Sequence, residues 1–113
     1  MKLFFKDKFN ESLISWDYLI EDINDTLSYN PYCKSADFYI VFKHIILSLL
    51  LDKEIILLDS DFTDSELINL VGRSNFNSFK EPINKDKFLL LNNYDDLIKR
   101  LRSLPKNWKI TLF

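Results

Sequence analysis

Apolar side chains recur at helical spacing in the first third of the chain, and polar side chains occupy the positions between them. The apolar positions, three or four residues apart, are Trp16, Leu19, Ile20, Ile23 and Leu27. This spacing predicts an amphipathic helix. Ser15 directly precedes it and is expected to cap its N-terminus, while the Asn30-Pro31 pair is expected to end the segment in a turn.

A second helix is predicted from residue 37 to residue 51. Most of its circumference is apolar, and only Lys43, His44 and Ser48 form a narrow polar stripe. A helix with this pattern is typically buried on several sides.

Two further helices are indicated by their capping residues. Thr63-Asp-Ser-Glu66 matches a capping box, in which the threonine hydroxyl and the glutamate carboxylate each bond a backbone amide. The helix that follows is expected to stop near Gly72. Asn93 is expected to cap a last helix, which has acidic residues in its first turn and basic residues in its last, and which Pro105 ends.

Short apolar runs predict three buried strands, near residues 54–59, 88–91 and 108–113. They alternate with helices from residue 37 onward, an order typical of a parallel sheet. An N-terminal hairpin is predicted from residues 3–9 and the segment near Leu13-Ile14. The expected fold class is therefore α/β: a small three-layer unit with a short parallel sheet flanked by helices. Residues 73–87 show no periodicity, and a loop of this length is typically functional, mobile or covered by a partner.

The amino-acid composition mainly excludes several classes of binding motif and site. With 113 residues and 13.5 kDa, residues 1–113 are expected to form a single α/β domain. Gly72 is the only glycine, whereas a Walker loop, a dinucleotide fingerprint and a nucleophile elbow each need two or more. One cysteine and one histidine exclude a disulfide scaffold and the ordinary cysteine/histidine zinc sites.

Nucleic acid is not an expected partner, because 15 basic residues are balanced by 17 acidic ones. The basic residues that could form such a surface are spread among acidic ones without a recognised spacing; they are Lys80, Lys85, Lys87, Lys99, Arg100 and Arg102, with Phe76 and Phe79 nearby.

His44 and Cys33 are the two residues whose type alone suggests catalysis. No serine, cysteine or carboxylate motif accompanies His44, so we interpret it as a helical histidine that is bonded or wetted along the polar stripe. Cys33 follows Asn-Pro-Tyr and is interpreted as an ordinary thiol in a turn. No catalytic, cofactor-binding or metal-binding residue is predicted.

Asp59 and Asp61 follow the predicted strand 54–59, at the edge where parallel sheets bind ligands. Two carboxylates at this position could hold Mg²⁺, as in a receiver-like domain. The early strand, however, does not end in the acidic pair that a receiver needs. We therefore interpret both residues as turn formers that lead into the capped helix.

No signal peptide or membrane-spanning segment is predicted, and a lone cysteine suits a reducing compartment, so a cytoplasmic location without membrane contact is expected. The last residues, Lys109-Ile-Thr-Leu-Phe113, alternate like a core strand. This pattern predicts either an edge strand or a reading frame that continues past Phe113.

Two stretches together resemble the amino-terminal segment of the AMP-forming acyl- and aryl-CoA synthetases, the adenylate-forming ligases. They are Ile14-Ser-Trp-Asp-Tyr-Leu-Ile-Glu-Asp-Ile-Asn24, which resembles the opening helix, and Phe42 to Asp59, which resembles the following helix, turn and strand. Leu104-Pro-Lys-Asn-Trp-Lys-Ile-Thr-Leu-Phe113 looks like the strand that precedes the phosphate loop of that family. The turn at Asp52-Lys53 departs from the family, in which it often carries glycine.

The resemblance implies that residues 1–113 are a non-catalytic amino-terminal portion of such a ligase, a scaffold for carboxylate adenylation. The phosphate loop and the catalytic residues are absent from this chain, so no cofactor is expected in it; ATP, Mg²⁺ and coenzyme A are implied for the parent enzyme. The implied partner is the remainder of the ligase domain, or a second copy of the chain, covering the last strand. The alternative is a free-standing α/β protein-interaction module.

Overall fold

The structure is a computed structural model that describes residues 3–7, 12–72, 79–84, 90–103 and 109–112. The chain begins with the predicted hairpin, in which β1 (Leu3–Asp7) pairs antiparallel with β2 (Ser12–Ser15). Helix α1 (Trp16–Asp25) follows β2 directly. The Ser15 hydroxyl accepts a hydrogen bond from the backbone amide of Tyr18 at 3.1 Å, which confirms the predicted cap.

The central feature is a three-stranded parallel sheet in the order β4-β5-β7. Its strands are β4 (Tyr32–Lys34), β5 (Ile55–Leu58) and β7 (Ile110–Leu112). Helix α2 (Phe38–Leu51) joins β4 to β5, and α3 (Asp64–Val71) and α4 (Tyr94–Arg102) lie between β5 and β7 in the chain. A separate antiparallel pair joins β3 (Ser28–Tyr29) to β6 (Glu81–Pro82). The predicted α/β class with a short parallel sheet is confirmed.

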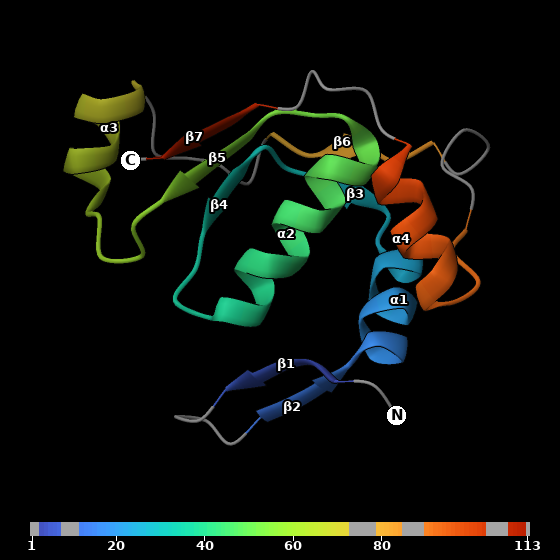
Figure 1. The fold of residues 1–113 in the computed structure, drawn as a ribbon. Coiled ribbons are helices and arrows are strands. Elements are labelled where there is room, and N and C mark those ends of the chain that lie inside the picture. Colours follow the sequence, from blue (N-terminus) through green and yellow to red (C-terminus); the bar gives the residue numbers. More distant parts are fainter. Residues whose placement is uncertain (1–2, 8–11, 73–78, 85–89, 104–108, 113) are drawn as a thin grey trace.

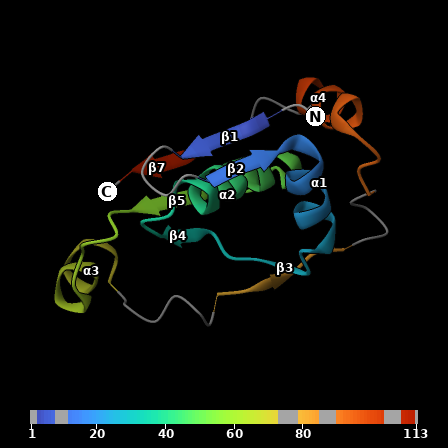
Figure 2. The ribbon, with the colours of Figure 1, turned by 90° about the horizontal axis from the view of Figure 1, so that it is seen from below.

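The elements form layers. Figures 1 and 2 show α2 between the parallel sheet and the N-terminal hairpin, with α1 and α4 beside one another at one end of the sheet. Trp16 of α1 and Tyr94 of α4 make an edge-to-face ring contact with centroids 4.8 Å apart.

The predicted strand near residues 88–91 is wrong in its described part. Leu90 and Leu91 have irregular backbone, and residues 88 and 89 lie outside the described residues. The third strand of the parallel sheet is instead β4, which contains Cys33, a residue that the sequence analysis places in a turn. A run of leucines cannot by itself distinguish a strand from a buried irregular segment, and a three-residue strand is too short to show alternation.

The main hydrophobic core lies between the helices. It joins buried residues of α1, α2 and α4 to two residues outside the helices; the set is Leu19, Ile20, Ile23, Leu47, Leu50, Leu97, Tyr29 and Leu91. Ile55 and Leu58 of β5 are also buried. They point to opposite faces of the sheet because side chains alternate along a strand, so the prediction that this strand is buried on both faces is confirmed.

Helix α2 is less buried than its composition predicted. Leu47, Ser48 and Leu50 in its second half are buried, whereas Phe38, Ile40 and Phe42 in its first half are 58%, 46% and 45% exposed. The buried residues of α2 thus lie in its C-terminal half. An apolar pattern over the whole helix carries no information about which of its ends is covered.

The remaining helix ends agree with the sequence. Thr63 and Glu66 form the reciprocal capping box at the start of α3, and Gly72 ends that helix with a left-handed φ of 77°. The Asn93 side chain accepts a hydrogen bond from the backbone amide of Asp96 at 3.0 Å and caps α4. Among the described residues, the helices are too short or too polar to cross a bilayer.

Candidate functional site

His44 is held by a backbone carbonyl. Its Nε2 bonds the carbonyl oxygen of Asn30, and its ring meets the Tyr29 ring edge-on with centroids 5.2 Å apart. Because a carbonyl can only accept, Nε2 carries the hydrogen and Nδ1 is left to take up a proton. Burial, and to a smaller extent the charge of Lys43, lowers the pKa of His44. The interpretation of His44 as a bonded helical histidine is confirmed.

Cys33 lies in β4 and not in a turn, and its side chain is buried. Burial raises the pKa of the Cys33 thiol, which disfavours the thiolate needed for nucleophilic attack. We therefore interpret Cys33 as a buried residue with a structural role in the sheet.

Asp59 and Asp61 form a turn at the carboxyl end of β5. The Asp59 carboxylate accepts a hydrogen bond from the backbone amide of Asp61 at 2.9 Å, and the capped helix α3 follows. This geometry agrees with their interpretation as turn formers. Within the described ranges, histidine, cysteine and acidic side chains do not gather in groups of three or more that could hold a metal ion.

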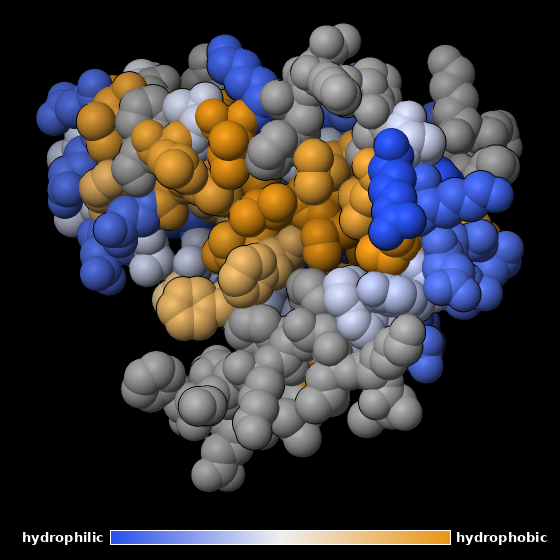
Figure 3. All heavy atoms as spheres, in the orientation of Figure 1, coloured by the Kyte–Doolittle hydropathy of each residue, from blue (hydrophilic) through white to orange (hydrophobic). Residues whose placement is uncertain are grey.

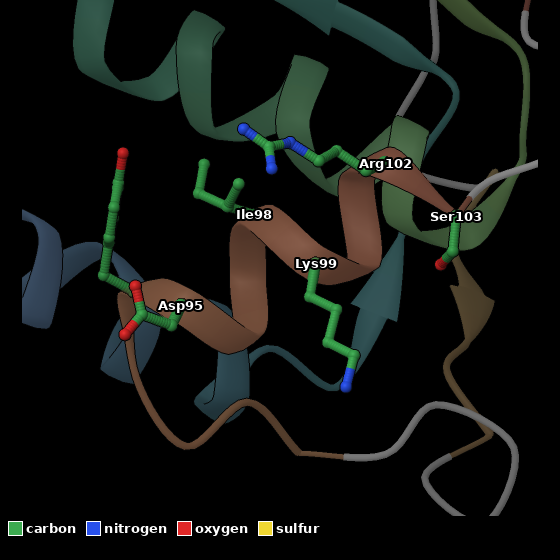
Figure 4. Close-up of a pocket in the computed structure, with 6 residues that line it drawn as sticks. Asp95, Ile98, Lys99, Arg102 and Ser103 are labelled. Atoms are coloured by element: carbon green, nitrogen blue, oxygen red, sulfur yellow. The ribbon is translucent and has the colours of Figure 1, made fainter.

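A hollow with a volume of about 520 Å³ lies along α4. Figure 4 shows the side chains of Lys99 and Arg102 pointing away from one another, and Asp95 lies at the opposite end of the helix. The charged groups of this hollow therefore do not converge on a common point.

Another cavity, of about 200 Å³, lies between α2 and the segment around β3, and Lys80, which directly precedes β6, also lines it. We call it the His44 cavity; its lining includes Tyr29, Ile40, Lys43, His44, Leu47 and Lys80. Four of these residues, Ile40, Lys43, His44 and Leu47, lie on one face of α2 because they follow the i, i+3, i+4, i+7 spacing of a helix. The cavity thus combines apolar and basic side chains on one wall.

Lys43 and Tyr39 both bind Asp22 of α1. Lys43 Nζ lies 3.1 Å from Asp22 Oδ1, and the Tyr39 hydroxyl donates to Asp22 Oδ2 at 2.7 Å. Burial and the neighbouring carboxylate raise the pKa of Tyr39. This network fixes α1 against α2 and positions Lys43 at the cavity. Sequence reasoning missed it, because a pair 21 residues apart leaves no local pattern.

The sheet ends at β7, which pairs with β5 alone among the described strands. The Ile55 amide donates to the Lys109 carbonyl at 3.1 Å. Because hydrogen bonds alternate along a parallel ladder, the backbone N–H and C=O groups of Ile110 and Leu112 face the open edge. The side chain of Leu112 is 70% exposed. Among the described strands, β7 is therefore an edge strand, which is one of the two interpretations that the sequence pattern left open.

Apolar side chains also gather on the face shown in Figure 3, over α2 and toward α3. Among the exposed large apolar residues are Phe38 and Phe42 on α2 and Ile68 and Leu70 on α3. Phe79, one of the two aromatic residues that the sequence places near the basic side chains, contacts Tyr32 with ring centroids 5.6 Å apart. The other, Phe76, lies outside the described residues.

Comparison of the chain with protein-family models, with curated proteins and with solved structures gave no match.

Proposed function

We propose that this chain is a non-catalytic α/β scaffold unit, the amino-terminal portion of an AMP-forming acyl- or aryl-CoA synthetase, whose sheet is extended by further protein at β7. The observation that carries the proposal is the open edge of β7, with its outward-facing amides and its exposed Leu112. An open edge with apolar side chains favours the addition of another strand.

The direction of the strands supports the ligase form of this proposal. β7 runs parallel to β5, so its carboxyl end lies at the same edge of the sheet as the turn at Asp59. Ligands of parallel α/β sheets bind at that edge. A phosphate-binding loop that followed β7 would begin there, which is the place that the resemblance of residues 104–113 implies.

In this proposal the chain is a structural scaffold and contributes no catalytic residue. Cys33 and His44, the two candidate catalytic side chains, have structural partners or surroundings in the fold. ATP, Mg²⁺ and coenzyme A would bind the remainder of the ligase.

The test has two steps: the coding region is read past Phe113, and any longer protein is assayed for ATP–pyrophosphate exchange with fatty and aryl acids. We expect the frame to enter a loop rich in serine, threonine and glycine, followed by lysine. We also expect exchange by the longer protein and none by the 113-residue chain. A stop codon directly after Phe113, or turnover by the short chain alone, would contradict the ligase proposal.

A free-standing interaction module is the second candidate, and the exposed phenylalanines of α2 favour it. Phe38 and Phe42 are one turn apart and lie on the same side of the helix. They enlarge the apolar surface beyond what a single added strand would cover. If a stop codon follows Phe113, this candidate predicts a second copy of the chain as partner, and Phe42→Lys should then abolish self-association.

A further inference from the structure

We propose that the His44 cavity binds a small carboxylic acid in its anionic form. The carboxylate would lie near Lys43 and Lys80, and the apolar body would contact Ile40 and Leu47. This site is separate from the β7 edge and does not depend on the proposed scaffold function.

The charges at the cavity favour an anion. Lys43 is already paired with Asp22, so these two groups compensate one another. Lys80 also lines the cavity, and within the described part of the chain it has no ion-pair partner. The cavity therefore carries one uncompensated positive charge, which an anionic ligand would neutralise.

The remainder of the lining favours a carboxylate over an inorganic anion. Ile40 and Leu47 belong to the same wall as Lys43, and the cavity of about 200 Å³ is much larger than one water molecule requires. Phosphate would make no apolar contact with Ile40 and Leu47. A carboxylate on a short hydrocarbon body would contact both the basic and the apolar side chains of the cavity. This combination of apolar walls and a few polar groups is typical of small-molecule sites.

His44 makes binding depend on pH. Its Nδ1 can take up a proton while Nε2 stays bonded to Asn30. The groups that face it from its own helix and the neighbouring elements are Lys43, Tyr29, Lys80 and, through Lys43, Asp22. A bound anion would stabilise the imidazolium form, so ligand affinity should increase as the pH falls.

His44 is the only histidine, so its ring resonances in an NMR spectrum of the full 113-residue chain report on this cavity without ambiguity. The probes are butyrate, inorganic phosphate and butylammonium. We expect butyrate to shift the His44 resonances in a saturable way and to raise the pKa of His44 at saturation. We expect phosphate to bind more weakly, and butylammonium not to bind.

Lys80→Met tests the charge, and Lys53→Met is its matched control. Lys80 is exposed, so its replacement leaves the fold intact; Lys53 pairs with Glu81 at 2.7 Å and does not line the cavity. Lys80→Met should weaken butyrate binding roughly threefold to fivefold, the range of an exposed ion pair, and Lys53→Met should leave it unchanged. Absence of a saturable butyrate shift, equal binding by both variants, or tighter binding of phosphate or butylammonium would overturn the proposal.

Discussion

The side-chain amide of Asn24 forms two hydrogen bonds with the backbone of Leu91. Asn24 Nδ2 donates to the Leu91 carbonyl at 2.8 Å, and the Leu91 amide donates to Asn24 Oδ1 at 2.9 Å. The two residues are 67 positions apart in the chain, and the side chain satisfies both backbone groups as a neighbouring strand would. This contact ties the segment before α4 to the end of α1 and fixes where α4 enters the core.

Asn24→Ala should therefore destabilise the fold. Two hydrogen bonds are lost and two partly buried backbone groups lose their partner, so we expect a decrease of about 2 kcal/mol in the free energy of unfolding. Urea denaturation followed by circular dichroism measures it. Asn92→Ala, at an exposed neighbouring position, should change stability by less than about 0.5 kcal/mol. Equal effects of the two substitutions would show that the Asn24 contact does not hold the segment.

Thr63→Ala should weaken α3. The substitution removes the hydroxyl that accepts the Glu66 amide at 3.2 Å, and loss of such a cap typically costs about 1 kcal/mol. Ser65→Ala in the first turn of the same helix is the control and should be neutral or slightly stabilising, because alanine is the better helix former. Both variants are compared by thermal and urea denaturation, and a neutral Thr63→Ala would contradict the capping box.

Gly72→Ala should also destabilise the end of α3, although the space around it is free. A Cβ atom at this position would have no heavy atom within 4 Å, so any loss must come from the backbone, whose φ is 77°. An L-residue in this conformation is disfavoured by about 1 kcal/mol, whereas asparagine tolerates it better. The order of unfolding free energies should be Gly72, then Gly72→Asn, then Gly72→Ala.

His44 should make stability depend on pH in the mildly acidic range. Its pKa is lower in the folded chain than its ordinary value near 6.5, so the unfolded chain binds more protons below that value. This contribution to stability is complete above about pH 6.5 and decreases as the pH falls below it. The difference in unfolding free energy between the parent chain and His44→Gln should therefore change between about pH 7 and pH 5, and a constant difference would contradict the burial of a neutral ring.

The sequence predicts this fold where the signal is local, and it fails where the contact is distant. The caps at Ser15, Thr63 and Asn93 and the hairpin were readable because their hydrogen bonds span a few residues. The strand expected near residues 88–91 was not correct in its described part, where the backbone of Leu91 bonds the Asn24 side chain and not a neighbouring strand. A tertiary side-chain contact of this kind leaves no periodicity in the sequence.

The candidate site was less predictable than the fold. His44 was correctly interpreted as a bonded helical residue, but the cavity beside it requires α2 and the residues before β6 to come together. Lys80 lies in a segment without periodicity, so nothing in the sequence places it near Lys43. The spacing of Ile40, Lys43, His44 and Leu47 on one helix face was the one available signal.

Hydrogen exchange at the amides of Ile110 and Leu112 tests most directly whether β7 is an edge strand to which a strand of further protein pairs. In the dilute 113-residue chain both amides should exchange rapidly, while the Thr111 amide, which faces β5, is protected. Both should become protected when the sheet is extended, in the longer protein if the frame continues or at high concentration if a second copy is the partner. Slow exchange of both amides in the dilute chain, or rapid exchange under each of these conditions, would contradict the scaffold account.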